Sequence, residues 1–186
     1  GGSIEHNVPS DWQEGVGYTQ NTHGGGVCIA ALAGKAQSVF TLSGDARISD
    51  NVGASGGGVM VWNNARFIMN GGTMSGNRAL GLNGLGNGGA VYVNSTTSAF
   101  DFNGGAINGN SRLRYGGAIN INQGSTLNLT GGTIHGNTSN YGGGVSQEQG
   151  ECSMTIRQDI TLSGNTAAYD GGGLFIEMGT VVLDGC

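Results

Sequence analysis

The sequence predicts an all-β protein that coils as a parallel β-helix, and three observations support this. A short phrase of two or three small residues followed by an apolar residue occurs six times. A second phrase that ends in Asn keeps step with it, and a stretch of alternating apolar residues lies between the two. Helices are excluded because 40 of the 186 residues are Gly and no segment has the i, i+3, i+4, i+7 apolar pattern.

The first phrase marks the start of each predicted coil. Its six copies begin at Gly24, Gly56, Gly88, Gly116, Gly142 and Gly171. The steps between them are 32, 32, 28, 26 and 29 residues, within the range of internal repeats that form solenoids. The sequence therefore predicts about six coils of roughly 28 residues each.

The alternating apolar stretches complete each period. They lie at residues 67–69, 100–102, 127–129, 154–156 and 181–183. Each period then contains three short strands separated by Gly and Asn turns. Strands this short are stabilised by pairing with their counterparts in the next coil, about 4.8 Å away.

The second phrase predicts a ladder of Asn side chains. It ends at Asn51, Asn77, Asn110, Asn137 and Asn165. In stacked coils these five amides would hydrogen-bond to one another along the solenoid, as Asn ladders do in other stacked β-structures. The alternative is a polar binding stripe on the surface.

The repeat phrases resemble those of a known family. The GGA[ILV] phrases, with Phe67-Ile68-Met69-Asn70 and Phe100-Asp101-Phe102-Asn103, are similar to repeats of the polymorphic outer membrane proteins of chlamydiae and of other adhesin-like bacterial surface proteins. The resemblance covers nearly the whole chain and implies a single-stranded, right-handed parallel β-helix that is extracellular or on the cell surface. These motifs encode coil corners and identify no reactive site.

Charge and hydropathy exclude several kinds of partner. The formal net charge is −5, and Lys35 is the only lysine, so we expect no nucleic-acid binding. No run of 18 apolar residues and no signal-peptide pattern is present, so we expect no membrane insertion. Only 10% of residues are charged.

We expect no enzymatic activity, metal or cofactor. Glycoside hydrolysis requires two carboxylates roughly 5 to 9.5 Å apart, whereas the acidic residues here are scattered without an obvious partner. They include Asp45, Asp50, Asp101, Glu148, Glu151, Asp170 and Glu177. The three His and three Cys residues do not have the spacing of metal ligands. A polysaccharide lyase or hydrolase is therefore the least favoured alternative.

The two ends of the chain predict self-association. The chain reads as a single solenoid domain over residues 1–186, in which residues 1–7 align with 71–77 and residues 181–186 align with 67–72. The chain thus begins and ends partway through a coil, and we expect the start of one copy to complete the last coil of another. The division is a half-coil arm at 1–7, a long loop at 8–23, regular coils at 24–180 and a terminal half-coil at 181–186.

This alignment predicts a head-to-tail homopolymer, hence a non-catalytic structural subunit of a fibre or surface appendage. The expected interface consists of Gly1, Gly2, Ser3, Ile4, Asn7, Val181, Val182, Leu183, Asp184 and Cys186. The alternative explanation is that the boundaries are those of a fragment of a longer repeat array.

Two long loops suggest a second function. Residues 8–23 and 78–87 both extend from the corner before a glycine phrase, and long loops on one edge of a solenoid often bind partners. Trp12 and Tyr18 are the candidate ligand residues; they would stack on a sugar or on a neighbouring subunit, or fold under the loop. The alternative function is a monomeric adhesin or glycan-binding segment that recognises host or matrix glycans.

Two further residue sets have predicted positions. Tyr115, Tyr141 and Tyr169 each precede a glycine corner, so they are expected to stack along one edge, either stiffening the solenoid or forming a glycan platform. Cys28, Cys152 and Cys186 occupy different columns of the repeat. They are expected to be unpaired and buried, or to link the terminal coils of two subunits.

Overall fold

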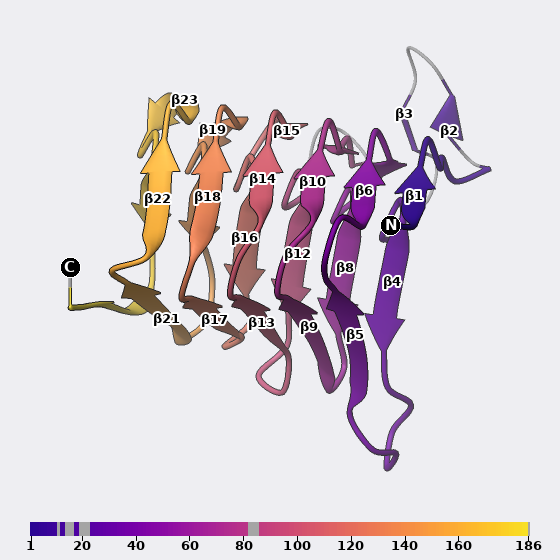
Figure 1. The fold of residues 1–186 in the computed structure, drawn as a ribbon, viewed down its shortest axis with the longest axis horizontal. Coiled ribbons are helices and arrows are strands. Elements are labelled where there is room, and N and C mark those ends of the chain that lie inside the picture. Colours follow the sequence, from indigo (N-terminus) through magenta and orange to yellow (C-terminus); the bar gives the residue numbers. More distant parts are fainter. Residues whose placement is uncertain (11, 14–16, 19–22, 82–85, 186) are drawn as a thin grey trace.

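The computed structural model describes residues 1–10, 12–13, 17–18, 23–81 and 86–185, with the backbone alone at 12–13 and 17–18. The described residues form 25 strands and no helix. Strands of successive coils lie side by side along the long axis, so the two ends of the chain lie at opposite ends of the molecule (Figure 1). The β-solenoid predicted from the repeats is confirmed.

Four parallel sheets make up the walls. Sheet 1 contains β4 (Val27–Ala30), β8 (Val59–Trp62), β12 (Val91–Asn94), β16 (Ile119–Asn122), β20 (Val145–Gln147) and β24 (Leu174–Ile176). Sheet 2 contains β5 (Ser38–Leu42), β9 (Ala65–Met69), β13 (Ala99–Phe102), β17 (Thr126–Leu129), β21 (Cys152–Arg157) and β25 (Gly179–Asp184).

The coil then continues through two more sheets. Sheet 3 contains β1 (Ser3–Glu5), β6 (Arg47–Ser49), β10 (Thr73–Ser75), β14 (Ala106–Asn108), β18 (Gly132–His135) and β22 (Ile160–Ser163). Sheet 4 contains β7 (Val52–Gly53), β11 (Arg78–Ala79), β15 (Ser111–Arg112), β19 (Thr138–Tyr141) and β23 (Thr166–Asp170). An antiparallel pair, β2 (Trp12–Gln13) and β3 (Gly17–Tyr18), lies outside these walls.

Sheet 4 corrects the prediction of three strands per coil. Its first three strands are two residues long and follow directly after the Asn phrase. A two-residue strand is too short to show an alternating apolar pattern, so sequence periodicity identifies only the other three columns.

Parallel pairing in register aligns equivalent side chains of successive coils. Phe67 of β9 pairs with Phe40 of β5 and Phe100 of β13. The rings of Phe67 and Phe100 stack with centroids 4.6 Å apart and planes 6° apart. The same column continues through Leu127 and Met154, so sheet 2 contributes a continuous apolar row to the core.

The glycine phrases form tight corners between sheets 4 and 1. Gly56 has φ of +60°, a conformation that L side chains adopt at a cost. A Cβ added to Gly57 would lie 2.3 Å from the carbonyl oxygen of Gly89 in the next coil. The second glycine of the phrase is therefore required by the close approach of two backbones.

The Asn residues of the second phrase form a continuous ladder. In each rung, the backbone N–H and the side-chain Nδ2 of one Asn donate to the Oδ1 of the Asn in the next coil, at 2.9 to 3.2 Å between Asn51 and Asn165. Asn51, Asn77, Asn110 and Asn137 are fully buried, so these positions do not form a surface stripe. Asn7 is an additional first rung, donating to Asn51.

Removing one Asn side chain tests how much the ladder contributes to the stability of the fold. Asn110→Ala should lower the free energy of unfolding by about 3–5 kcal/mol, because it leaves two buried donors of Asn77 without an acceptor and removes the hydrogen bond from Nδ2 to the carbonyl oxygen of Met74. Asn103→Ala is the control, since its amide bonds are exposed; it should cost less than about 1 kcal/mol. Denaturant unfolding measures the free energy of unfolding of both variants. Equal losses of stability in the two variants would contradict a structural role for the ladder.

Candidate functional site

The two ends of the solenoid are the candidate functional site. At the N-terminal end, β1, β4 and β5 are the edge strands of their sheets; at the C-terminal end, the edge strands are β22, β23, β24 and β25. Each of these strands pairs with a described strand on one side only, so within the described ranges a row of backbone donors and acceptors on its other side has no strand partner. Such edges are templates for pairing with another strand.

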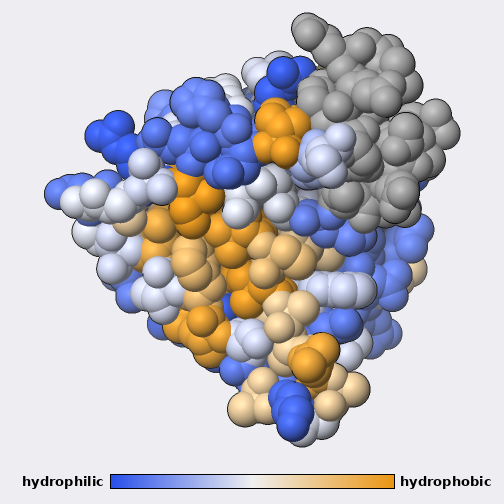
Figure 2. Space-filling view, turned by 90° about the vertical axis from the view of Figure 1, so that its right-hand side faces the viewer, coloured by the Kyte–Doolittle hydropathy of each residue, from blue (hydrophilic) through white to orange (hydrophobic). Residues whose placement is uncertain are grey.

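The N-terminal end leaves its apolar core uncovered. Ile4, Val27 and Phe40 pack against the core from the three sheets and remain partly exposed. Beside them, a shallow hollow of about 240 Å³ is lined by Ile4, Phe40, Leu42 and Ala46, among others. Figure 2 looks onto this end and shows apolar residues gathered across the face with polar residues around them.

The C-terminal end presents the matching set. Leu162, Leu174 and Val181 occupy the same three columns and also pack against the core with one side uncovered. Next to them, Ile176 is 47% exposed and Leu183 is 65% exposed. Among the residues that the structure describes, those at either end form no polar cap of the kind that usually closes a solenoid.

The Asn ladder gives the two ends opposite hydrogen-bonding character. At the C-terminal end, Nδ2 of Asn165 donates to the carbonyl oxygen of Ile134. Within the described part of the chain, its backbone N–H and second Nδ2 hydrogen have no acceptor. At the N-terminal end, Asn7 donates to Asn51 and Glu5, whereas its Oδ1 accepts no hydrogen bond from a described residue. The ladder therefore ends in donors on one face and in an acceptor on the other.

The structure separates the predicted interface residues into these two faces. Gly1, Gly2, Ser3, Ile4 and Asn7 lie at the N-terminal end, where Ile4 pairs with Ile48. Val181, Val182, Leu183 and Asp184 lie in β25 at the C-terminal end, and Cys186 lies outside the described residues. Asp184 is held by Arg157 at 3.6 Å, both side chains being exposed.

Sequence reasoning missed the contribution of sheet 1 and of Phe40. Val27 and Leu174 are the apolar residues of the first and last glycine phrases, so the repeat alignment contains the signal that could have identified them. The terminal segments alone do not point to these residues, because they lie more than ten residues inside either end of the chain.

The structure describes only parts of the two long loops, at residues 8–23 and 78–87. Trp12 and Tyr18 pair through their backbones in the β2–β3 hairpin, while their side chains lie outside the description. In the loop 78–87, residues 82–85 are likewise outside it. The structure therefore leaves the ligand role of these loops as a prediction.

The tyrosine stack is confirmed. The ring centroids of Tyr115 and Tyr141 are 5.2 Å apart, and those of Tyr141 and Tyr169 are 5.3 Å apart. Phe175 packs against Tyr141 at 5.2 Å, adding a fourth ring to the edge. The prediction that the thiols are unpaired and buried is correct for Cys152, whereas Cys28 is free but exposed.

Two acidic residues that the sequence leaves isolated have partners in the structure. Asp101 accepts hydrogen bonds from Arg66 and Asn128 on either side along sheet 2. Glu148 is 3% exposed and accepts hydrogen bonds from Asn87 and Asn122. Within the described ranges, no group of three His, Cys, Asp or Glu side chains is arranged to hold a metal ion.

Glu148 belongs to a buried polar network on the outer face of sheet 1. Nδ2 of Asn122 also donates to the Tyr92 hydroxyl at 3.3 Å. Burial raises the pKa of Glu148, with attraction from Arg114 opposing this and repulsion from Glu177 adding to it. Burial likewise lowers the pKa of Arg112 to about 9 and raises that of Tyr92. The network connects three coils.

No family model, curated protein or solved structure matches this chain. In the parts of the chain that the structure describes, no helix combines the length and the apolar character required to cross a membrane. The geometry of the two ends of the solenoid is therefore the main guide to its function.

Replacing Glu148 tests whether burial, rather than attraction to the arginines, sets the direction of its pKa shift. Because its pKa in the folded state is raised, the contribution of Glu148 to stability is fully present below about pH 4.5 and is lost as the pH rises through the folded-state pKa. Glu148→Gln should therefore gain stability relative to the wild type over that interval, measured by denaturant unfolding at a series of pH values. Glu151→Gln removes a nearby exposed carboxylate and is the control. A difference that falls with rising pH would show that attraction to the arginines dominates instead.

Proposed function

We propose that this chain is a non-catalytic structural subunit that associates head to tail, with the C-terminal end of one copy stacked on the N-terminal end of the next. The observation that carries the proposal is that the two ends present the same columns with complementary edges. Stacking would continue the parallel sheets from one copy into the next and cover both exposed ends of the core.

The register of the sheets supports this arrangement. In a stacked pair, Leu162 would lie over Ile4 in sheet 3, and Leu174 over Val27 in sheet 1, following the rows that the existing strand pairs define. In sheet 2, Val181 would lie over Phe40. Apolar residues would then meet apolar residues in all three columns.

The order of the sheets also continues across the junction. The chain ends in β25 of sheet 2, and within each coil sheet 2 is followed by sheet 3. In a stacked pair, β1 of the next copy supplies that sheet 3 strand. This is the coil completion predicted from the alignment of residues 1–7 and 181–186.

The polarity of the Asn ladder favours head-to-tail over head-to-head contact. The donors of Asn165 in one copy would face the free Oδ1 of Asn7 in the next, which adds one more rung to the ladder. Two N-terminal ends in contact would instead bring two acceptors together. A contact between unlike ends leaves a free end on each copy, and its repetition produces an open fibre.

The expected location is extracellular or on the cell surface. Support comes from the resemblance of the GGA[ILV] and FxxN phrases to bacterial surface repeats and from the low charged fraction of 10%. In this setting the partner of each copy is another copy of the same chain.

A charge placed on the exposed end tests the proposal. Leu183→Glu should raise the apparent dissociation constant at least tenfold, about 1.4 kcal/mol, because the carboxylate would be buried against the apolar end of a neighbour. Its fold should be unaffected, since Leu183 is already 65% exposed. Sedimentation velocity over a range of protein concentrations measures the association.

Leu113→Glu is the matched control, because Leu113 is 59% exposed and lies between β15 and β16, away from both ends. It should assemble like the wild type. A wild type that sediments as an 18.7 kDa monomer at every concentration, or equal loss of assembly in both variants, would overturn the proposal.

A further inference from the structure

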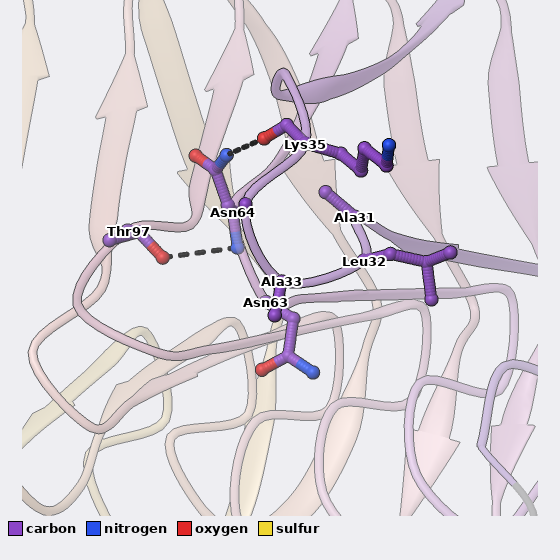
Figure 3. Close-up of a pocket in the computed structure, with 8 residues that line it drawn as sticks. Ala31, Leu32, Ala33, Lys35, Asn63, Asn64 and Thr97 are labelled. Atoms are coloured by element: carbon purple, nitrogen blue, oxygen red, sulfur yellow. Dashed lines mark hydrogen bonds between the residues drawn. The ribbon is translucent and has the colours of Figure 1, made fainter.

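A shallow groove follows the corner between sheets 1 and 2, and Lys35 is the one ionisable residue among those that line it. It consists of two hollows that share Asn63. The first, about 290 Å³, lies between the loop at residues 31–35 and the side chains of Asn63, Asn64 and Thr97 (Figure 3). The second, about 380 Å³, is lined by Trp62, Asn63, Asn94, Ser95, Thr96 and Gln123.

The backbone at this corner is unusual in the middle coils. The corner requires positive φ, and in three other coils glycine provides it, at Gly34, Gly150 and Gly179. In the coils between them, the turns place residues with side chains at positive φ, together with Gly124 at 74° in the turn that contains Gln123. The residues with side chains are Asn63, Asn64, Ser95 and Gln123, with φ of 50°, 57°, 114° and 55°.

Such a conformation is unfavourable for a residue with a Cβ and clusters at functional sites. Glycine would form the same turns without strain. Asn tolerates this conformation better than most residues, so the strain is greatest at Ser95 and Gln123, where a side chain is retained although glycine would form the turn.

Part of this cluster holds the turn in place, and part is free to bind. The backbone N–H of Asn64 donates to the Thr97 hydroxyl at 3.0 Å, and its Nδ2 donates to the carbonyl oxygen of Lys35. Figure 3 shows Asn63 projecting from the opposite side of the turn. The side chains of Asn63 and Gln123 form no hydrogen bond with any described residue, although each amide can both donate and accept.

An exposed indole lies beside these amides. Trp62 ends β8 and is 37% exposed. Its neighbours in the sheet are Ala30 on one side and Asn94 on the other. The His23 ring packs beside the indole, with centroids 6.2 Å apart, and the buried Oδ1 of Asn94 has no hydrogen-bond partner among the described residues.

We propose that this groove binds a neutral oligosaccharide. An indole presents an apolar face to the C–H face of a sugar ring, while amides and hydroxyls match the paired donor and acceptor character of sugar hydroxyls. The second hollow is lined by no ionisable side chain, so it offers nothing to recognise an acidic sugar. Successive turns bring these groups about 4.8 Å apart along the corner, which suits an extended chain of sugar rings.

Calorimetric titration with neutral β-linked hexasaccharides of glucose, mannose and N-acetylglucosamine tests the proposal, with oligogalacturonate as the acidic comparison. At least one neutral hexasaccharide should bind, and Trp62→Ala should weaken it at least tenfold. Leu113→Ala is the control, because it truncates an exposed apolar side chain between β15 and β16, away from the groove, and it should leave the affinity unchanged. The site lies on the side wall, so Leu183→Glu should also bind normally, whether or not the chain assembles.

The strained residues provide a second variant that separates binding from folding. Asn63→Gly and Gln123→Gly should each raise the unfolding midpoint, because glycine relieves the positive φ, and each should weaken sugar binding at least threefold. A structural role alone would leave the affinity unchanged. The proposal is overturned if no neutral hexasaccharide binds, if oligogalacturonate binds more tightly, or if Leu113→Ala weakens binding as much as Trp62→Ala does.

Discussion

The hydrogen-bonded ladder of buried Asn side chains is the constraint on which the rest of the structure depends. In each rung the backbone N–H and one Nδ2 hydrogen donate to the Asn of the next coil, and the other Nδ2 hydrogen donates to a carbonyl oxygen of the preceding coil. A one-residue slip of any coil would bury these polar groups without partners, at about 1–3 kcal/mol for each group. The ladder thereby aligns the columns, so that Phe67 meets Phe100 and the backbone of Gly57 approaches that of Gly89.

In a repeat structure, any coil can in principle be followed by another coil that stacks on it in the same way. Each interior coil is covered by its two neighbours, whereas the first and last coils keep one uncovered side. Here those sides expose core residues of three sheets and the unpaired ends of a directional ladder. A second copy in the same orientation would pair all of these groups together under the proposed assembly, whereas a small ligand or an unrelated surface would pair only some of them. The side wall is different, because its corner turns carry polar residues at positive φ, and the side chains of Asn63 and Gln123 form no hydrogen bond with any described residue of a neighbouring coil.

The sequence predicts the columns that repeat and misses features that arise from contacts between columns. The Gly phrases, the Asn phrase and the alternating stretches locate sheets 1, 3 and 2, because each has a periodic signature. Sheet 4 escapes detection because strands such as Val52–Gly53 carry no pattern. The pairing of Asp101 with Arg66, 35 residues apart, depends on the register of two coils of unequal length. The positive φ of Gln123 likewise becomes visible only once the corners are superimposed.

Electron diffraction from concentrated, aligned solutions of the chain tests the central claim most directly. Head-to-tail stacking of six rungs, each about 4.8 Å high, predicts filaments with a 4.8 Å meridional reflection and a longer axial repeat of about 29 Å. The longer repeat is the decisive one, because it requires copies to continue one another along the solenoid axis. Isolated particles, or filaments whose axial repeat is unrelated to six rungs, would contradict the account.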